Sequence, residues 1–397
     1  MSNIGDLKII YNKNKDNKAL EELEYFSGDI IKEVRNFHNS FSEYKITPLH
    51  DLQALAREYN VNKIWIKDES YRFGLNAFKV LGGSYAIAKY LSKITGTGKL
   101  SFDSLNKALS AKDISFITAT DGNHGRGVAW TANRLGYKAV VFMPEGSAED
   151  RISNIRREGA EVIVTDKNYD DTVQLAQEYA KVSGGIIVQD TAWEGYEEIP
   201  LWIMQGYATI IDEALEQVQS KPTHIFLQAG VGSFAASIQA SLIVRFGDEA
   251  PKVIIVEPHN ANCIYKSAQY NTEKAQTVSG SLSTIMAGLS CGTPNPIAWK
   301  ILRRYSTAFV SCPDYFAARG MRILASPTGD DQAVISGESA AVGPGLLSLI
   351  IDHQEYGDIL DNLGINSDSK ILFISTEGDT DPLMYKKIVW DGLYPVL

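Results

Sequence analysis

The chain has few cysteines, and they are widely separated in the sequence, which argues against a disulfide framework and against a zinc site. Its 397 residues contain only Cys263, Cys291 and Cys312. Three scattered cysteines are too few for a disulfide framework or a structural zinc site, although a Cys263–Cys291 pair joining two loops stays open. We therefore expect no bound metal.

Long apolar runs and basic segments are also missing. No apolar stretch reaches the ~18 residues that indicate a membrane span, and residues 1–6 are too polar for a signal peptide. The formal net charge of -10 argues against nucleic acid or an anionic membrane as a partner. We expect a cytoplasmic enzyme that acts on a small molecule, with no membrane and no nucleic acid involved.

Strand and helix patterns alternate along most of the chain, which predicts an α/β fold with parallel sheets covered by helices. The predicted strands are residues 63–67, 114–118, 139–143, 161–164, 185–189, 224–227, 253–256 and 370–374. The predicted helices include residues 78–91, 125–135 and 172–182. Ser147 and Asp150 resemble a capping box that opens a further helix.

Lys79 is the most informative residue because of its neighbours. It opens a predicted helix, follows Phe78 and precedes Gly82-Gly83-Ser84. A lone lysine at such a position is usually a solvated helix residue. Here the apolar neighbour favours a desolvated lysine, and the glycines let another group approach the helix closely. A desolvated lysine has a lowered pKa and can form an imine with an aldehyde.

A glycine-containing loop follows the predicted strand 114–118. Its sequence is Thr120-Asp121-Gly122-Asn123-His124-Gly125-Arg126-Gly127. A plain strand–helix turn with Asp121 as its cap would explain part of it. However, Asn123 offers a neutral amide to the ring oxygen of a pyridoxal, and three glycines expose backbone N–H groups suited to a carboxylate.

A second glycine loop follows the strand 224–227 and opens a helix. It consists of Gly230, Val231, Gly232 and Ser233 and matches G-x-G-x-x-A. With Glu257 at the end of the next strand, it also suits a nicotinamide site. Both readings share one physical basis, anion binding at a helix N-terminus. The loop therefore predicts a phosphate, and Lys79 favours pyridoxal phosphate because only an aldehyde cofactor uses an imine.

Four loops that could carry chemistry all follow predicted strands, at Asp121, Asp190, Gly230 and Ser375. In open α/β sheets, ligands bind outside the carboxyl ends of the strands. We expect these loops to converge on one crevice.

Together these motifs resemble the fold type II pyridoxal phosphate enzymes, the group with threonine dehydratase and the tryptophan synthase β chain. Phe78-Lys79 resembles their lysine motif, Gly122-Asn123-His124 resembles their G-N-H loop, and residues 144–162 are similar to their "P…K…R..GAEV" stretch. The resemblance runs from about Thr47 to the C-terminus.

That resemblance implies two domains, each with a twisted, mostly parallel sheet covered by helices, and an active site in the cleft between them. Residues 1–83 and 195–397 would form the large cofactor-binding domain, and residues 84–194 the small one.

Longer strings resemble one subgroup, the diaminopropionate ammonia-lyases. The dehydratases usually carry serine before G-N-H, whereas this chain has Asp121. Val188–Tyr196 and Ser375–Asp381 also resemble that subgroup. The resemblance implies 2,3-diaminopropionate as the substrate, pyruvate and ammonia as the products, and a homodimer.

The resemblance also implies a role for each candidate residue. Lys79 forms the Schiff base, while Asp121 and Asp190 are candidate Cα bases on opposite faces or binders of the second ammonium. Read without it, Asp190 is a turn or cap residue, and Glu338 either faces the site or caps a helix. The implied cofactor-binding residues are Phe78, Lys79, Asn123, Gly230, Val231, Gly232, Ser233 and either Ser375 or Thr376. The implied substrate-binding residues are Thr120, Asp121, Gly122 and His124.

Three other functions compete with this interpretation. The nearest is a serine or threonine dehydratase in which Asp121 is merely structural. A nicotinamide oxidoreductase built on the Gly230 loop would give Lys79 no role. A non-enzymatic cofactor-binding module is disfavoured by Lys79, because binding alone needs no imine.

Overall fold

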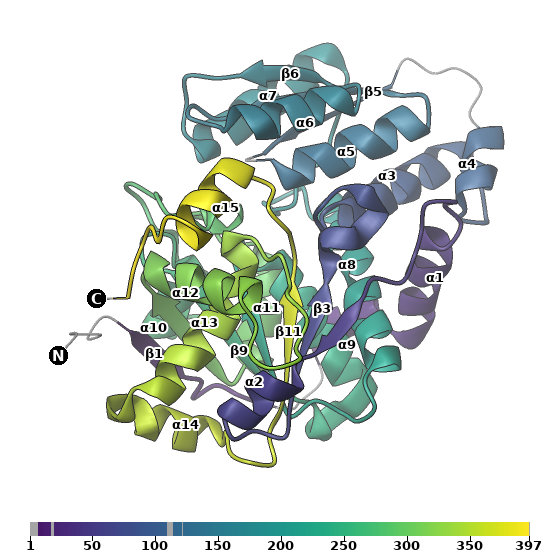
Figure 1. The fold of residues 1–397 in the computed structure, drawn as a ribbon. Coiled ribbons are helices and arrows are strands. Elements are labelled where there is room, and N and C mark those ends of the chain that lie inside the picture. The colour runs from purple at the N-terminus through teal and green to yellow at the C-terminus, as the bar shows by residue number, and fades with distance from the viewer. Residues whose placement is uncertain (1–6, 17–19, 109–113, 121, 397) are drawn as a thin grey trace.

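A computed structural model describes residues 7–16, 20–108, 114–120 and 122–396. The described strands form two sheets, one of seven strands in the order β1-β10-β9-β8-β11-β3-β2 and one of four in the order β6-β5-β4-β7. Neighbouring strands pair in parallel, apart from the antiparallel edge pairs β1–β10 and β2–β3. Helices pack against both sheets (Figure 1). The predicted fold class is confirmed.

The strands are β1 (Lys8–Tyr11), β2 (Leu49–Asp51), β3 (Lys63–Asp68), β4 (Ser115–Ala119), β5 (Lys138–Met143), β6 (Glu161–Val164), β7 (Ile186–Ile187), β8 (His224–Gln228), β9 (Lys252–Pro258), β10 (Ala308–Cys312) and β11 (Lys370–Ser375). The α-helices are α1 (Gly28–His38), α2 (Gln53–Glu58), α3 (Val80–Thr95), α4 (Phe102–Ala108), α5 (Asn123–Arg134), α6 (Glu149–Arg157), α7 (Tyr169–Ser183), α8 (Glu198–Gln217), α9 (Ser233–Phe246), α10 (Cys263–Tyr270), α11 (Pro296–Tyr305), α12 (Asp314–Ala325), α13 (Glu338–Asp352), α14 (Gly357–Leu363) and α15 (Pro382–Val389). The short 3₁₀ segments include η2 (Glu69–Gly74), η3 (Gly247–Glu249) and η4 (Ala287–Leu289). None of the described helices is long and apolar enough to cross a membrane.

The large sheet is buried on both faces, so its central strands are apolar throughout. Along β8, Ile225 and Leu227 face one core and Phe226 faces the other, as the period of two in a strand requires. Helices α8 and α9 cover the first face and α12 and α13 the second (Figure 1). This double burial is typical of parallel sheets.

Helix α3 joins the two sheets through close contacts at glycines. A Cβ atom at Gly82 would lie 2.6 Å from the Tyr207 ring of α8, and one at Gly206 would lie 2.4 Å from the Leu81 carbonyl oxygen. On its other side, a Cβ at Gly127 of α5 would lie 2.7 Å from Val80 Cα. The absence of a side chain at Gly82 thus lets helix α8 pack closely against α3. This packing fixes the start of α3.

The smaller sheet and helices α5, α6 and α7 gather at one end of the molecule (Figure 1). All four of its strands fall between Ser115 and Ile187. We therefore keep residues 84–194 as the proposed small domain, with 1–83 and 195–397 as the proposed large one.

Two local predictions are wrong. Helix α6 begins after Ala148 with no side-chain cap, and Ser147 Oγ instead donates to the Pro144 carbonyl at 2.8 Å. The strand predicted over 185–189 is limited to Ile186–Ile187, because Gln189 turns away from the ladder and hydrogen-bonds through its side chain. The sequence also did not predict strands β1, β2 and β10.

A buried ionic network ties α8 to the segment that leads to Lys79. Glu213 accepts from Lys67 Nζ at 2.7 Å and from Arg72 Nη1 at 2.8 Å. Arg72 Nε also donates to Glu69 at 2.8 Å. Burial alone would raise the pKa of Glu213, but the bonds and charges of Arg72 and Lys67 lower it to about 2. Two cations and two carboxylates therefore balance inside the protein.

Replacing Glu213 with glutamine is expected to destabilise the fold by about 3 kcal/mol or more, because it leaves buried positive charge without a partner. Urea unfolding at neutral pH measures this loss. Since the folded pKa of Glu213 is depressed, its contribution is present above about pH 4.5 and is lost as the pH falls toward 2. The difference in the free energy of unfolding between the wild type and Glu213→Gln should therefore become smaller in acid.

The matched control is Glu216→Gln, which removes an exposed carboxylate from the same helix that pairs with Arg35. It should change the free energy of unfolding by no more than about 1 kcal/mol. Equal losses in both variants would contradict a special role for the buried network.

Candidate functional site

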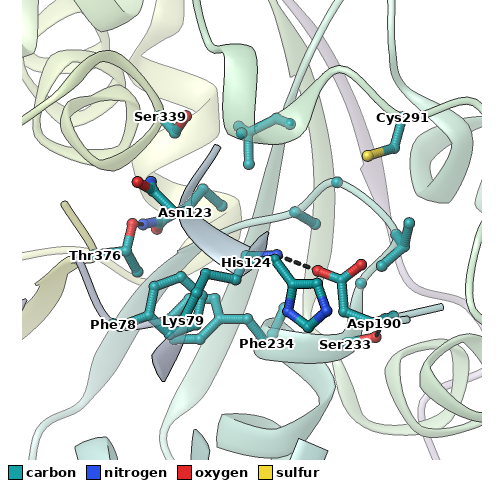
Figure 2. A pocket seen from close by; sticks show the side chains of 18 of the residues that line it. Phe78, Lys79, Asn123, His124, Asp190, Ser233, Phe234, Cys291, Ser339 and Thr376 are labelled. Atoms are coloured by element: carbon teal, nitrogen blue, oxygen red, sulfur yellow. Dashed lines mark hydrogen bonds and ion pairs between the residues drawn. The ribbon is translucent and has the colours of Figure 1, made fainter. Parts of the chain in front are cut away.

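A pocket with about 690 Å³ of empty space lies at the carboxyl ends of the large sheet's strands (Figure 2). Segments far apart in the sequence contribute to its wall. Among the predicted site residues, those that line it are Phe78, Lys79, Thr120, Asn123, His124, Asp190, Gly230, Val231, Gly232, Ser233 and Thr376. Gly122 and Ser375 are not part of the wall, and Asp121 lies outside the described residues.

Lys79 stands at the N-cap of α3, one position earlier than a residue of the helix proper. Its Nζ contacts the Asp190 carboxylate (Figure 2). Phe78 packs beneath it, with ring centroids 4.7 Å from Tyr207 and 5.0 Å from Phe234. The apolar neighbour predicted for this lysine is therefore part of an aromatic cluster that fixes the start of α3.

Asp190 is buried but ionised. Burial alone would raise its pKa, yet the charge of Lys79, followed by His124, lowers it to about 2. Burial lowers the pKa of His124, whose Nε2 lies 2.8 Å from the Val188 carbonyl and whose Nδ1 has no partner among the described residues. The site thus holds a lysine, a carboxylate and an imidazole within one pocket.

Gln189 and Tyr196 hold the backbone that carries Asp190. Gln189 Oε1 accepts from the Ala119 amide at 3.0 Å, and its Nε2 donates to the Tyr169 hydroxyl at 2.9 Å. The Tyr196 hydroxyl accepts from the Gln189 amide at 2.8 Å. These contacts join the end of β4 to the Asp190 turn. We did not assign either residue from sequence, although both lie in the string Val188–Tyr196.

The β4–α5 loop is closed by a side chain that was predicted to bind substrate. Thr120 Oγ1 accepts from the Gly122 amide at 2.9 Å and from the Gly125 amide at 3.2 Å. A Cβ atom at Gly125 would lie 2.4 Å from Thr120 Cγ2. The threonine side chain therefore shapes the loop, and Asn123 is presented at the start of α5.

The β8–α9 loop turns at Gly232, which has a φ of +90° and caps α9. Such a φ favours glycine. The first amides of α9 have no partner within the helix and point outward, which makes the loop suitable for an anion. Ser233 Oγ donates to the Asp190 carbonyl at 2.8 Å and accepts from Asn295 Nδ2 at 2.9 Å. The anion loop and the Asp190 turn are thereby locked together.

Residues 41–356 match the family described as pyridoxal-phosphate dependent enzyme. The chain belongs to this family. Pyridoxal 5'-phosphate is accordingly its cofactor, as the sequence predicted. The chain is 50% identical to the diaminopropionate ammonia-lyase of Salmonella typhimurium strain LT2, over 93% of this chain and 94% of that one.

Solved structures agree with this membership. The holo diaminopropionate ammonia lyase from Escherichia coli superposes with a TM-score of 0.93 at 47% identity, covering 99% of this chain and 98% of that one. The same E. coli enzyme in complex with an aminoacrylate-PLP azomethine reaction intermediate gives 0.91 at 46% identity, covering 99% of each chain.

The residues present fit pyridoxal phosphate. Lys79 reaches the pocket, the Gly230–Ser233 loop offers amides to a phosphate, and Thr376 presents a hydroxyl. Four buried polar atoms of the wall have no partner among the described residues, namely His124 Nδ1, Tyr207 Oη, Ser339 Oγ and Glu377 Oε1. A polar ligand in the pocket would satisfy them.

The structure distinguishes the two hydroxyls that sequence left open. Thr376 lines the pocket, and its Oγ1 accepts from Gln228 Nε2 at 2.7 Å. The hydroxyl hydrogen of Thr376 is then available to the ligand. Ser375 Oγ is buried away from the pocket, where it donates to Ser336 Oγ at 3.0 Å.

Two further sequence alternatives are narrowed by the geometry. Glu338 is the first residue of α13, directly after the N-cap Gly337. It also lines the cleft adjoining the pocket. Cys263 and Cys291 are thiols rather than a disulfide. The wall residues Gln228 and Glu377 were not assigned a role from sequence, although Glu377 lies in the string Ser375–Asp381.

Proposed function

We propose that the chain catalyses the α,β-elimination of 2,3-diaminopropionate, as both D and L isomers, to pyruvate and two molecules of ammonia. The similar proteins that carry the name diaminopropionate ammonia-lyase support this substrate. The observation that carries the proposal is the contact between Lys79 and the ionised Asp190 inside the pocket. It provides an amine and a carboxylate base at one point.

Each chain residue has a chemical task in this proposal. Pyridoxal phosphate, when bound, supplies an electron sink that makes the substrate's Cα proton removable. Lys79 would hold the cofactor covalently, its amine bonding the aldehyde carbon with loss of water. Asp190 would accept a proton on the lysine's side of the substrate, and Asp121 is proposed as the base on the opposite face.

A carboxylate before the G-N-H motif also accounts for substrate choice. Diaminopropionate carries a second ammonium where serine carries a neutral hydroxyl. A charge-assisted contact between Asp121 and that ammonium would be worth roughly 1.5–3 kcal/mol. Gly122 and His124 belong to the same loop, which we propose as the seat of the substrate carboxylate.

The test compares kcat/KM for D- and L-2,3-diaminopropionate with those for serine and threonine. We expect diaminopropionate to be preferred by about tenfold or more, as the charge-assisted contact predicts. Preference for serine or threonine would instead support the runner-up, a dehydratase in which Asp121 has a structural role.

Replacing Thr376 with valine is expected to lower kcat by about tenfold, since the hydroxyl that we propose to meet the pyridine nitrogen is lost. Ser375→Ala is the matched control, because that hydroxyl bonds Ser336 rather than the ligand. Steady-state kinetics on both variants decide the assignment. A larger loss in Ser375→Ala would reverse it.

We also propose that the enzyme is a homodimer and acts in the cytoplasm. The family resemblance supports the dimer, and the composition supports the compartment. Light scattering at micromolar concentration should return twice the mass of one chain.

A further inference from the structure

Glu377 follows Thr376 at the end of β11 and enters the pocket wall beside Asn123. Its side chain is buried, with 3% of the residue exposed. Asn123 Nδ2 donates to Glu377 Oε2. The Gly337 amide donates to the Glu377 carbonyl at 2.9 Å, and a Cβ at Gly337 would lie 2.8 Å from Glu377 Cγ. The packing therefore leaves room for this carboxylate and directs it at the amide.

A carboxylate selects one orientation of an amide. An ionised carboxylate only accepts hydrogen bonds, while an asparagine amide has a donor end and an acceptor end. With the amide turned over, Asn123 Oδ1 would face Glu377 Oε2, and two acceptors would meet in a buried setting. The donor end must therefore face Glu377. Because Nδ2 carries two hydrogens, the second one stays available to the pocket.

A second carboxyl, that of Glu338, lies near Glu377. Glu338 is also buried, and burial followed by the charge of Glu377 raises its pKa to about 7. Arg151 lowers that pKa, and Asp381 raises it. Glu338 has no hydrogen bond to Asn123 among those found in the structure, so only one of the two carboxyls can orient the amide.

We propose that Glu377 is a positioning residue that orients the Asn123 amide so that its second N–H points at the ring oxygen of the cofactor. This inference rests on the proposed function, in which Asn123 meets that oxygen. Donation to the oxygen favours its ionised form, and hydrogen bonds to the ring tune the cofactor's electronics. Glu377 would thus act on the cofactor through Asn123, without touching it.

The test is a double-mutant cycle on the holoenzyme, with two readouts besides turnover. The first is the visible absorption band, which reports an ionised ring oxygen, against the near-ultraviolet band of the neutral form. The second is the dissociation constant of pyridoxal phosphate. Glu377→Met removes the acceptor, and we expect it to shift absorption to the near-ultraviolet and to weaken cofactor binding by about tenfold. Asn123→Ala should do the same.

The double variant Glu377→Met/Asn123→Ala should be no worse than Asn123→Ala alone, because residues that act as one unit are not additive. Glu377→Gln keeps an acceptor of the same size and should restore much of the visible band. Should the Met variant fail to fold, the cycle is run with Gln, whose smaller effect should likewise vanish in the Asn123→Ala background. Effects that add in full would overturn the proposal, as would a wild-type spectrum in Glu377→Met.

Glu338→Gln is the control, since it removes the neighbouring carboxyl and leaves the Asn123 contact. Its spectrum should match the wild type, and a shift as large as that of Glu377→Met would overturn the assignment. Failure of the proposed function looks different. In that case the wild-type holoenzyme would show normal cofactor spectra but would not act on diaminopropionate.

Discussion

Replacing Lys79 with alanine is expected to lower turnover of 2,3-diaminopropionate by about 10⁴-fold or more, because it removes the amine that bonds the cofactor. The variant should keep its fold, since Lys79 stands at the N-cap of α3 and the aromatic contacts of Phe78 remain. Borohydride reduction followed by mass spectrometry gives an independent readout. The wild type should retain the cofactor covalently, and the variant should lose it on denaturation.

The control for Lys79→Ala is Lys93→Ala on the same helix, where the lysine is exposed and pairs with Glu198. It should retain wild-type turnover and covalent cofactor. A Lys79→Ala protein with full activity would remove the basis for the whole mechanism.

Asp121→Asn and Asp190→Asn are expected to separate the two isomers of the substrate. The Cα protons of the D and L isomers would point to opposite sides of the bound substrate, so each isomer would need its own base. Loss of a positioned base costs about 10²–10⁴-fold. We expect each variant to lose that much kcat on one isomer and far less on the other, with opposite preferences. Steady-state kinetics of both variants with each isomer separately measure these losses of kcat.

Asp190→Asn also removes the carboxylate charge that pairs with Lys79. The control is Asp248→Asn, an exposed aspartate in η3. It should leave both isomers unchanged. Equal losses on D and L in both site variants would contradict the division between two bases and leave one shared base as the alternative.

The sequence predicted the parts of the site that local chemistry marks. A lysine flanked by an aromatic residue and glycines favours an imine, glycine loops directly after apolar strands favour anion binding, and the carboxyl ends of parallel strands meet at one edge. The pocket accordingly brings together Lys79, Asn123, Asp190 and the Gly230 loop. The central strands were also predictable, because double burial gives continuous apolar runs.

The sequence could not choose between Ser375 and Thr376. Successive strand residues face opposite sides, so the register decides which hydroxyl enters the pocket. Thr376 enters it, and Ser375 bonds Ser336. The short edge strands β1 and β2 were missed for a related reason. Each is only half-buried and pairs antiparallel at the rim, so no apolar run marks it.

Contacts between distant segments were the least predictable. Asn123 and Glu377 are 254 positions apart, and Gln228 and Thr376 are 148 apart. The Lys67–Glu213 ion pair spans 146 positions. Each of these residues alone resembles an ordinary polar side chain. Only the packing of α5, α8 and β11 brings the two members of each pair together. Such partners supply the orientation of the site, while the sequence motifs supply its chemistry.

The proposed elimination is tested by the ammonia released per pyruvate, measured with purified protein and a single isomer of 2,3-diaminopropionate. The proposed elimination releases the β-amino group as ammonia and then the α-amino group by hydrolysis. We expect two ammonia per pyruvate. One ammonia per pyruvate, or pyruvate formed from serine alone, would contradict it.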